Sequence, residues 1–124
     1  MGATMIVRIT GIAQLLLGVL IWMGNAGGLV PVHMLIGLIF VLAMWVLGFR
    51  AMRAGVAAWL AGILLLWGAA ILALGMTQAQ LMPGPNHAAI QIVHVLTGLI
   101  GMGLSEMVGK RMRIAKEGGA AAAM

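Results

Sequence analysis

Two long stretches without a charged side chain constrain the fold of this chain most strongly. No Asp, Glu, Lys or Arg occurs between Arg8 and Arg50 or between Arg53 and Glu106, intervals of 41 and 52 residues. A helix that spans a bilayer needs about 20 apolar residues, so each interval has room for two spans and a turn. Backbone polar groups in lipid must be paired within the spanning segment, which helices achieve. The sequence therefore predicts an all-α integral membrane protein.

Short connections rich in Gly, Pro and polar residues separate the expected spans. We place the spans at residues 9–23, 30–49, 56–76 and 88–108. Because short connections favour neighbouring helices of opposite direction, the predicted architecture is an antiparallel four-helix bundle, a single membrane domain over residues 1–124. The last residues, 114–124, are small and featureless and are predicted to form a flexible tail.

The basic residues gather at one end of the predicted spans. They are Arg8, Arg50, Arg53, Lys110, Arg111, Arg113 and Lys116. Lys and Arg are enriched on the cytoplasmic side of membrane proteins, so both termini are predicted to be cytoplasmic. We expect a multi-pass protein of the bacterial or archaeal cytoplasmic (inner) membrane. The net charge of +5 is explained by these flanking residues, and nucleic acid is not an expected partner.

A short phrase containing histidine occurs twice in the uncharged stretches. The pattern V-H-x-L-x-G-L-I covers residues 32–39 and again 93–100. Over residues 32–50, a shift of 61 positions gives eight identities. A composition this biased gives about two by chance. Spans one and three resemble each other more weakly, through residues 15–18 and 64–68. The chain therefore has the pattern of a duplicated helical hairpin.

The two histidines of this phrase, His33 and His94, are the leading candidates for a functional site. An ionisable ring in hydrocarbon is costly and indicates function by default. His33 precedes Arg50 by 17 residues and His94 precedes Lys110 by 16. At 1.5 Å per residue both rings are expected about 25 Å from the cytoplasmic anchors, in the outer half of the bilayer. On diagonal helices they face each other, as the two axial ligands of a haem iron must.

Glycines near this depth leave room for a flat cofactor. Gly37 and Gly98 each follow a histidine by four residues and so share its helix face. On the other two helices, the walls against the edges of a macrocycle are predicted to be formed by Gly18, Gly24, Gly68 and Gly75. Close helix packing through small residues accounts for the same glycines, and the two interpretations are compatible.

The third histidine, His87, lies seven residues before His94 and about 10 Å nearer the outer surface. Three roles remain open for it: a residue at the start of a helix, a partner of haem propionates, or an axial ligand that replaces His94. The other polar side chains available on this side are Asn25, Gln78, Asn86 and Gln91.

Histidines on the second and fourth spans of a glycine-rich four-helix bundle resemble the membrane b-type cytochromes. These include the cytochrome b of quinol-oxidising complexes, the cytochrome b561 group and haem A synthase halves. The resemblance rests on the two H-x-x-x-G phrases at His33 and His94 and on the glycine rows. It implies one haem b with two histidine ligands. A second pair of ligands would lie near Leu47 and Val108, where the sequence has no histidine.

The same resemblance implies an electron carrier rather than an enzyme. Two histidine ligands fill both axial positions, which argues against oxygen chemistry. The candidate partners, besides the lipid bilayer, are a quinone, a redox partner or larger respiratory complex, and a second copy of the chain in a homodimer. The chain has no cysteine, which excludes a covalent c-type haem, iron–sulfur clusters and thiolate metal sites.

Two other functions stay open at this point. A small proton-coupled transporter needs a titratable carboxylate in the membrane. Gln14 cannot titrate, and Glu106, beside Lys110, is better explained as an ion-pair residue at the interface. A structural subunit without haem would hold the histidines by hydrogen bonds to helix backbones. It would use the four tryptophans for contacts with lipid or partners: Trp22, Trp45, Trp59 and Trp67.

Overall fold

The computed structural model describes residues 2–124, and long helices make up most of them. The four long helices are α1 (Ala3–Trp22), α2 (Val30–Arg53), α3 (Ala58–Thr77) and α4 (His87–Ala123). Short 3-10 turns, η1 (Gly27–Leu29) and η2 (Gln78–Gln80), lie before α2 and after α3. All four helices are long and apolar enough to cross a membrane. The prediction of an all-α chain with four apolar helices is confirmed.

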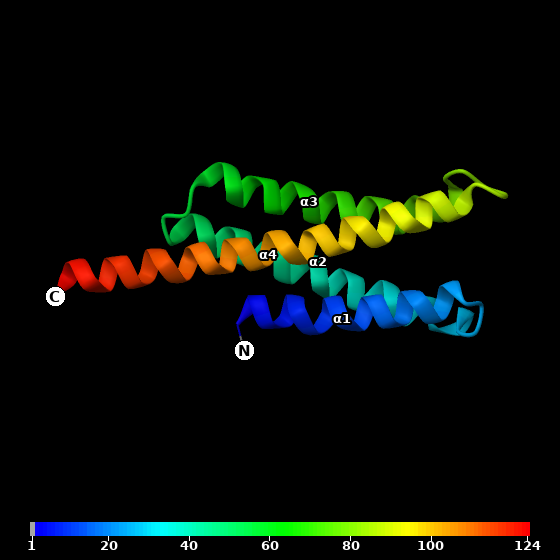
Figure 1. Cartoon of the computed structure of the whole chain (residues 1–124), viewed down its shortest axis with the longest axis horizontal. Coiled ribbons are helices and arrows are strands. Elements are labelled where there is room, and N and C mark those ends of the chain that lie inside the picture. The colour runs from blue at the N-terminus through cyan, green and yellow to red at the C-terminus, as the bar shows by residue number, and fades with distance from the viewer. Residues whose placement is uncertain (1) are drawn as a thin grey trace.

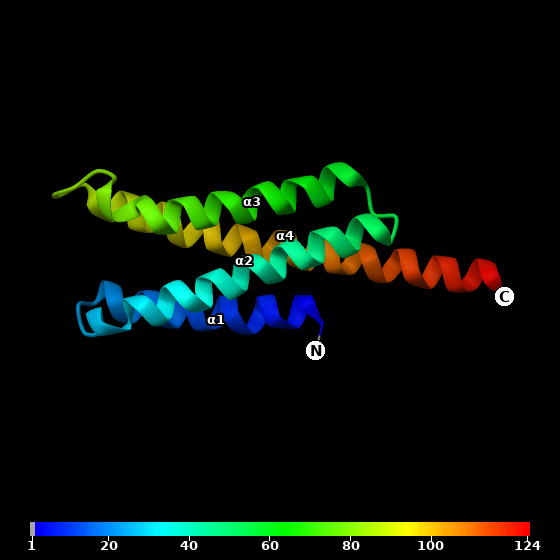
Figure 2. The same ribbon diagram turned by 180° about the vertical axis from the view of Figure 1, so that it is seen from behind.

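The helices lie side by side in a bundle, with the connections at its two ends (Figure 1). The α1–α2 and α3–α4 connections are at one end, and the α2–α3 connection is at the other. The view from behind shows α2 crossing the bundle against α4, with α1 and α3 on either side (Figure 2). Both α2 and α4 contact α1 and α3 as well as each other. The two helices that carry the repeated histidine phrase are therefore the central pair.

The turns between helices use residues suited to them. Gly24 follows α1 and Gly55 follows α2, and both have a φ of 77°, in the left-handed region that glycine adopts without strain. Pro31 lies in the first turn of α2, where its missing N–H has no intrahelical acceptor to lose. These three residues set the ends of the first two helices.

Fully buried side chains are confined to one half of the bundle, the half that contains the α2–α3 connection. They occur in residues 3–11, 40–71 and 101–108, which we call the packed half. In residues 12–39 and 72–100, which we call the histidine half, every side chain is at least partly exposed. The packed half is centred on Met44 and Leu64, both with 0% exposure. The chain thus closes tightly at one end and leaves the histidine end loosely filled.

Two tryptophans tie neighbouring helices together. The indole Nε1–H of Trp45 in α2 donates to the carbonyl oxygen of Leu65 in α3, at 3.0 Å. Trp67 in α3 donates to the carbonyl of Thr97 in α4, at 2.9 Å. An indole N–H shielded from water needs such an acceptor. These two tryptophans therefore hold the bundle itself together, and among the four it is Trp22 and Trp59 that are exposed.

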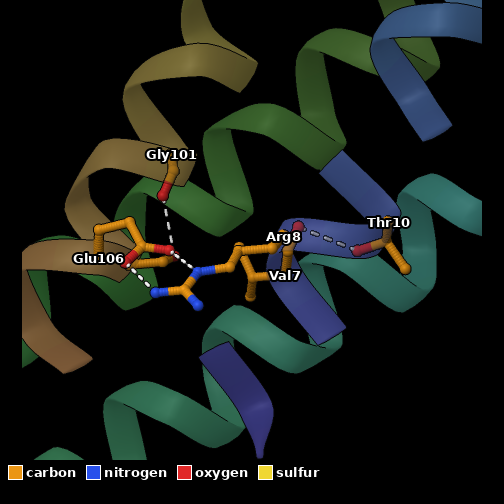
Figure 3. Close-up of polar contacts among 6 residues, drawn as sticks. Val7, Arg8, Thr10, Gly101 and Glu106 are labelled. Carbon is orange, nitrogen blue, oxygen red and sulfur yellow. Dashed lines mark hydrogen bonds and ion pairs between the residues drawn. The ribbon is translucent and has the colours of Figure 1, made fainter. Parts of the chain in front are cut away.

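An ion pair connects the first and last helices (Figure 3). The guanidinium of Arg8 donates from Nη2 to Oε2 of Glu106 at 2.8 Å, and from Nε to Oε1. The sequence led us to expect Glu106 to pair at the interface, next to Lys110, and the partner is Arg8 of α1. Nearby, Ser105 is fully buried and donates its hydroxyl to the carbonyl of Gly101, one turn earlier.

The helices extend beyond the predicted spans by four residues or more at three ends. α1 begins at Ala3, α2 continues to Arg53, and α4 continues to Ala123. The last turns of α4 extend beyond the rest of the bundle (Figure 1). Residues 114–124, expected as a flexible tail, are thus helical up to Ala123, which suits a segment rich in alanine, the strongest helix former. Their flexibility stays a prediction.

Candidate functional site

The structure brings His33 and His94 together at the centre of the histidine half. The rings project from α2 and α4, with centroids 6.2 Å apart and ring planes inclined by 60°. Both residues are partly buried. Because α2 and α4 pack against each other, the rings face one another across the middle of the bundle. Helices α1 and α3 lie on the two sides of the pair.

Each ring has one nitrogen shielded from solvent and without a hydrogen bond. Within residues 2–124, the buried side-chain nitrogen and oxygen atoms that lack a partner are Nδ1 of His33, Nδ1 of His94 and Oε1 of Gln14. A buried polar atom left unpaired costs about 1–3 kcal/mol. The described residues therefore do not supply the backbone hydrogen bonds expected of two purely structural histidines. All three unpaired atoms belong to one site.

Two cavities, of about 240 and 360 Å³, adjoin the histidine pair. The first lies chiefly among α1, α2 and α4, and the second chiefly between α2 and α3. Residues that line both cavities are Gln14, His33, Gly37, Ile71, Gln78 and His94. Mostly apolar walls with a few converging polar groups are typical of cofactor and small-molecule sites. The hollow region of the histidine half thus extends to two sides of the ring pair.

A glycine from the preceding helix faces each ring. A β-carbon placed on Gly18 of α1 would lie 3.6 Å from Cε1 of His33, and one on Gly75 of α3 would lie 3.4 Å from Cε1 of His94. These distances are ordinary van der Waals contacts. A side chain larger than methyl at either position would therefore push the ring away from its present place. Gly18 lines the first cavity and Gly75 the second.

The two glycines that follow the histidines have different surroundings. A β-carbon on Gly98 would have no described heavy atom within 4 Å beyond its own helix neighbourhood, and Gly98 lines the first cavity. A β-carbon on Gly37 would lie 2.5 Å from Nε2 of Gln14. Gly98 therefore borders free space. Gly37 instead makes room for the Gln14 amide.

Three predicted site residues lie away from the cavities. Gly24 occupies the turn after α1, and Gly68 packs under Trp45, where a β-carbon would be 2.7 Å from Nε1. Nδ1 of His87 lies 3.2 Å from the carbonyl oxygen of Leu81, at the start of α4. This position agrees with the helix-start role for His87. Neither cavity is lined by these three residues.

Gln14 belongs to the site, although sequence reasoning considered it only as a group that cannot titrate. Its carboxamide lines both cavities next to the histidines. The sequence did indicate the importance of Gln14, because a polar amide is a costly side chain to place within an uncharged span. Its position opposite Gly37 depends on how α1 packs on α2, which the sequence pattern does not specify.

The 6.2 Å between the ring centroids lies in the ordinary range for an edge-to-face ring pair and also matches two imidazoles bound to one metal ion. An imidazole–metal bond is about 2 Å long, and the ring centre lies about 1 Å beyond the nitrogen, so two collinear ligands place their centroids about 6 Å apart. The observed separation is 6.2 Å. Residues 2–124 contain no group of three or more His, Cys, Asp or Glu side chains able to hold a metal ion. Two ligands alone suit a metal that brings its other ligands with it, as haem iron does.

No protein-family model, curated protein or solved structure matches this chain. Function must therefore be inferred from the geometry and chemistry of the site.

Proposed function

We propose that this chain is a membrane b-type cytochrome that binds one haem b between His33 and His94 and transfers electrons. The observation that carries the proposal is the pair of facing rings, 6.2 Å apart, beside two cavities in the loosely filled half of the bundle. When bound there, haem would supply a one-electron redox couple at its iron. If both histidines bound the iron, they would leave it no free coordination position for oxygen, which favours an electron carrier over an oxygen-activating enzyme.

The residues around such a site would have different roles. His33 and His94 supply the nitrogen ligands from the two central helices. Gly18 and Gly75 allow each ring to lie close against the neighbouring helix. Gly98 keeps the wall beside His94 free of side chain. The largely apolar cavity walls would exclude water and so favour the apolar faces of a macrocycle over small hydrated ions.

We further propose an antiparallel membrane bundle with both termini in the cytoplasm of a bacterium or archaeon. The support is the distribution of charge: Arg50 and Arg53 lie in the last turn of α2, and Arg8 lies near the start of α1, remote from the histidines. The site would then lie in the outer half of the membrane. A quinol, a redox protein or a larger respiratory complex at that side would be the electron partner.

A proton-coupled transporter has less support. The carboxylate that such a carrier needs would have to be Glu106, which is engaged by two hydrogen bonds from Arg8. Its side chain is 45% exposed in the packed half rather than facing the cavities.

A reduced-minus-oxidised visible spectrum of protein purified from haem-replete cells tests the proposal. We expect a b-type spectrum with one haem per chain in the wild type. His33→Ala and His94→Ala should each lose most of the bound haem. The matched control is His87→Ala, which removes the histidine outside the cavities and should keep wild-type haem content. A colourless wild-type protein, or full haem content in both alanine variants, would contradict the proposal.

A further inference from the structure

The two helical hairpins bring a glycine and a histidine together in the same way. In the first hairpin Gly18 of α1 faces His33 of α2, and in the second Gly75 of α3 faces His94 of α4. Gly18 and Gly75 therefore hold equivalent positions. Seven residues before each of them is another glycine, Gly11 or Gly68, so the equivalence continues along α1 and α3.

One position breaks this equivalence. Four residues before Gly18 is Gln14, and four residues before Gly75 is Ile71. Both side chains line both cavities, so each lies beside the histidine pair. The first hairpin thus brings an amide to the site where the second hairpin brings a hydrocarbon. The two histidines consequently have unequal surroundings.

In the first hairpin, four residues form a compact group between α1 and α2. His33 packs on Gly18, and Gln14 packs on Gly37. Gln14 and Gly18 are one helical turn apart, and so are His33 and Gly37. The amide and the ring therefore occupy adjacent levels of one helix interface, and both residues opposite them are glycines without side chains.

The two side chains in this group have complementary unpaired atoms. Oε1 of Gln14 can only accept a hydrogen bond, whereas Nδ1 of His33 donates one when the proton is on that nitrogen. Both atoms are buried without a partner in the described chain. The Gln14 amide also lies so close to Gly37 that even a methyl group there would overlap it. A rotation of the Gln14 side chain that brings Oε1 to Nδ1 of His33 would pair both atoms.

We propose that Gln14 is a positioning residue for His33, with Oε1 of Gln14 accepting a hydrogen bond from Nδ1–H of His33. The bond holds the proton on Nδ1 and leaves the Nε2 lone pair available for a metal. Histidine ligands commonly donate their second ring N–H in this way, which fixes the tautomer and raises the basicity of the ligand. Ile71 offers His94 no such acceptor. The consequence for iron rests on the proposed function, whereas the hydrogen bond itself does not.

The hydrogen bond is tested first without haem. Protein with ¹⁵N-labelled histidine is prepared from haem-deficient cells in detergent micelles, and the ring nitrogens are observed by NMR. We expect His33 in the Nδ1–H form in the wild type and a changed tautomer balance for His33 alone in Gln14→Ile. Gln80→Ile, which replaces an exposed glutamine that lines neither cavity, is the matched control and should change neither ring. An unchanged His33 signal in Gln14→Ile, or equal changes in His33 and His94, would overturn the proposal.

The effect on the metal site is tested by exchanging the two inequivalent residues. In haem-loaded protein, Gln14→Ile should weaken haem binding about 10-fold or more and raise the midpoint potential, because His33 becomes a poorer donor. Ile71→Gln should shift the potential in the opposite direction, and the double exchange should return it toward the wild type. Unchanged haem affinity and potential in Gln14→Ile would overturn the role of Gln14. A wild-type protein that binds no haem would instead refute the proposed function, and the NMR result would still decide whether Gln14 binds His33.

Discussion

Arg8 and Glu106, 98 residues apart in the sequence, join α1 to α4 through two hydrogen bonds. The side chains are 47% and 45% exposed, so solvent screens much of their attraction. The pair contributes mainly to the specificity of helix packing, because it connects α1 to α4. No equivalent charge pair is available to α3, whose sequence from Ala58 to Thr77 contains no ionisable residue.

Reversing one charge of this pair should destabilise the bundle slightly. Glu106→Arg places two guanidinium groups together between α1 and α4, and we expect a lower midpoint of unfolding in an SDS titration. The double variant Arg8→Glu/Glu106→Arg restores opposite charges and should recover part of the loss. Glu117→Arg, an exposed change near the end of α4, serves as the control. If the loss of stability in the double variant equals the sum of the losses in Arg8→Glu and Glu106→Arg alone, the pair is not formed.

The packed half should determine global stability without determining cofactor binding. Leu64 is completely buried within the hydrophobic core. Replacing it by alanine leaves a cavity and should lower the free energy of unfolding by about 2–5 kcal/mol. The ratio of haem to folded protein should stay at the wild-type value, because Leu64 lines neither cavity at the histidines. Loss of haem from the folded fraction would contradict a division of the bundle into two halves.

Gly68 should be required for helix packing rather than for a cofactor. An alanine there would press on the Trp45 indole, 2.7 Å from Nε1, and disturb its hydrogen bond to Leu65. Overpacking of this kind costs about 1–3 kcal/mol. The matched control is Gly62→Ala in the same helix, where the structure shows open space and no loss is expected. Unfolding midpoints of the two variants in SDS provide the comparison, and equal midpoints would exclude the Trp45 contact as the cause.

Gly98→Ala should change stability and haem binding in opposite directions. The new methyl group enters free space in the first cavity, and alanine is better than glycine within a helix by about 0.5–1 kcal/mol. The haem-free protein should therefore unfold at a higher SDS concentration than the wild type. Haem titration should show weaker binding, because the methyl group occupies part of the cavity wall. Weaker binding together with lower stability would mean general damage to the fold instead.

His94→Met tests whether the ring acts as a ligand or only as a packing group. Methionine can also bind haem iron, and a His/Met pair has a higher potential than two histidines. We expect His94→Met to retain haem with a raised midpoint potential, whereas His94→Leu, of similar size, should lose it. Equal haem content in the methionine and leucine variants would indicate that position 94 does not ligate the iron.

The number and type of the helices could be predicted because charge is so unevenly distributed. Two helices pass through the uncharged interval after Arg8 and two through the one after Arg53, which gives each helix an apolar stretch long enough to span lipid. The residues at which the helices begin and end were harder to predict. α4 continues through a basic and alanine-rich segment to Ala123, because helix propensity persists where hydrophobicity stops.

The site could be predicted in part for a different reason. His33 and His94 were identified from a repeated phrase, and that repeat is strong in spans two and four. Spans one and three resemble each other weakly, and comparison of their leucine runs pairs Gly18 with Gly68. The packing instead makes Gly75 the counterpart of Gly18. Helix register depends on side-chain fit between neighbours, so the place of Gln14 beside His33 required the structure.

The confinement of tight packing to one half of the bundle bears on how the mature protein is made. A chain whose core closes around Met44 and Leu64 can fold with its helices in order independently of the cavities beside His33 and His94. If the chain binds haem as proposed, haem would then be inserted last, into a bundle that is already folded. In that case, cells starved of haem should accumulate a stable, protease-resistant haem-free protein that takes up haem when the supply returns.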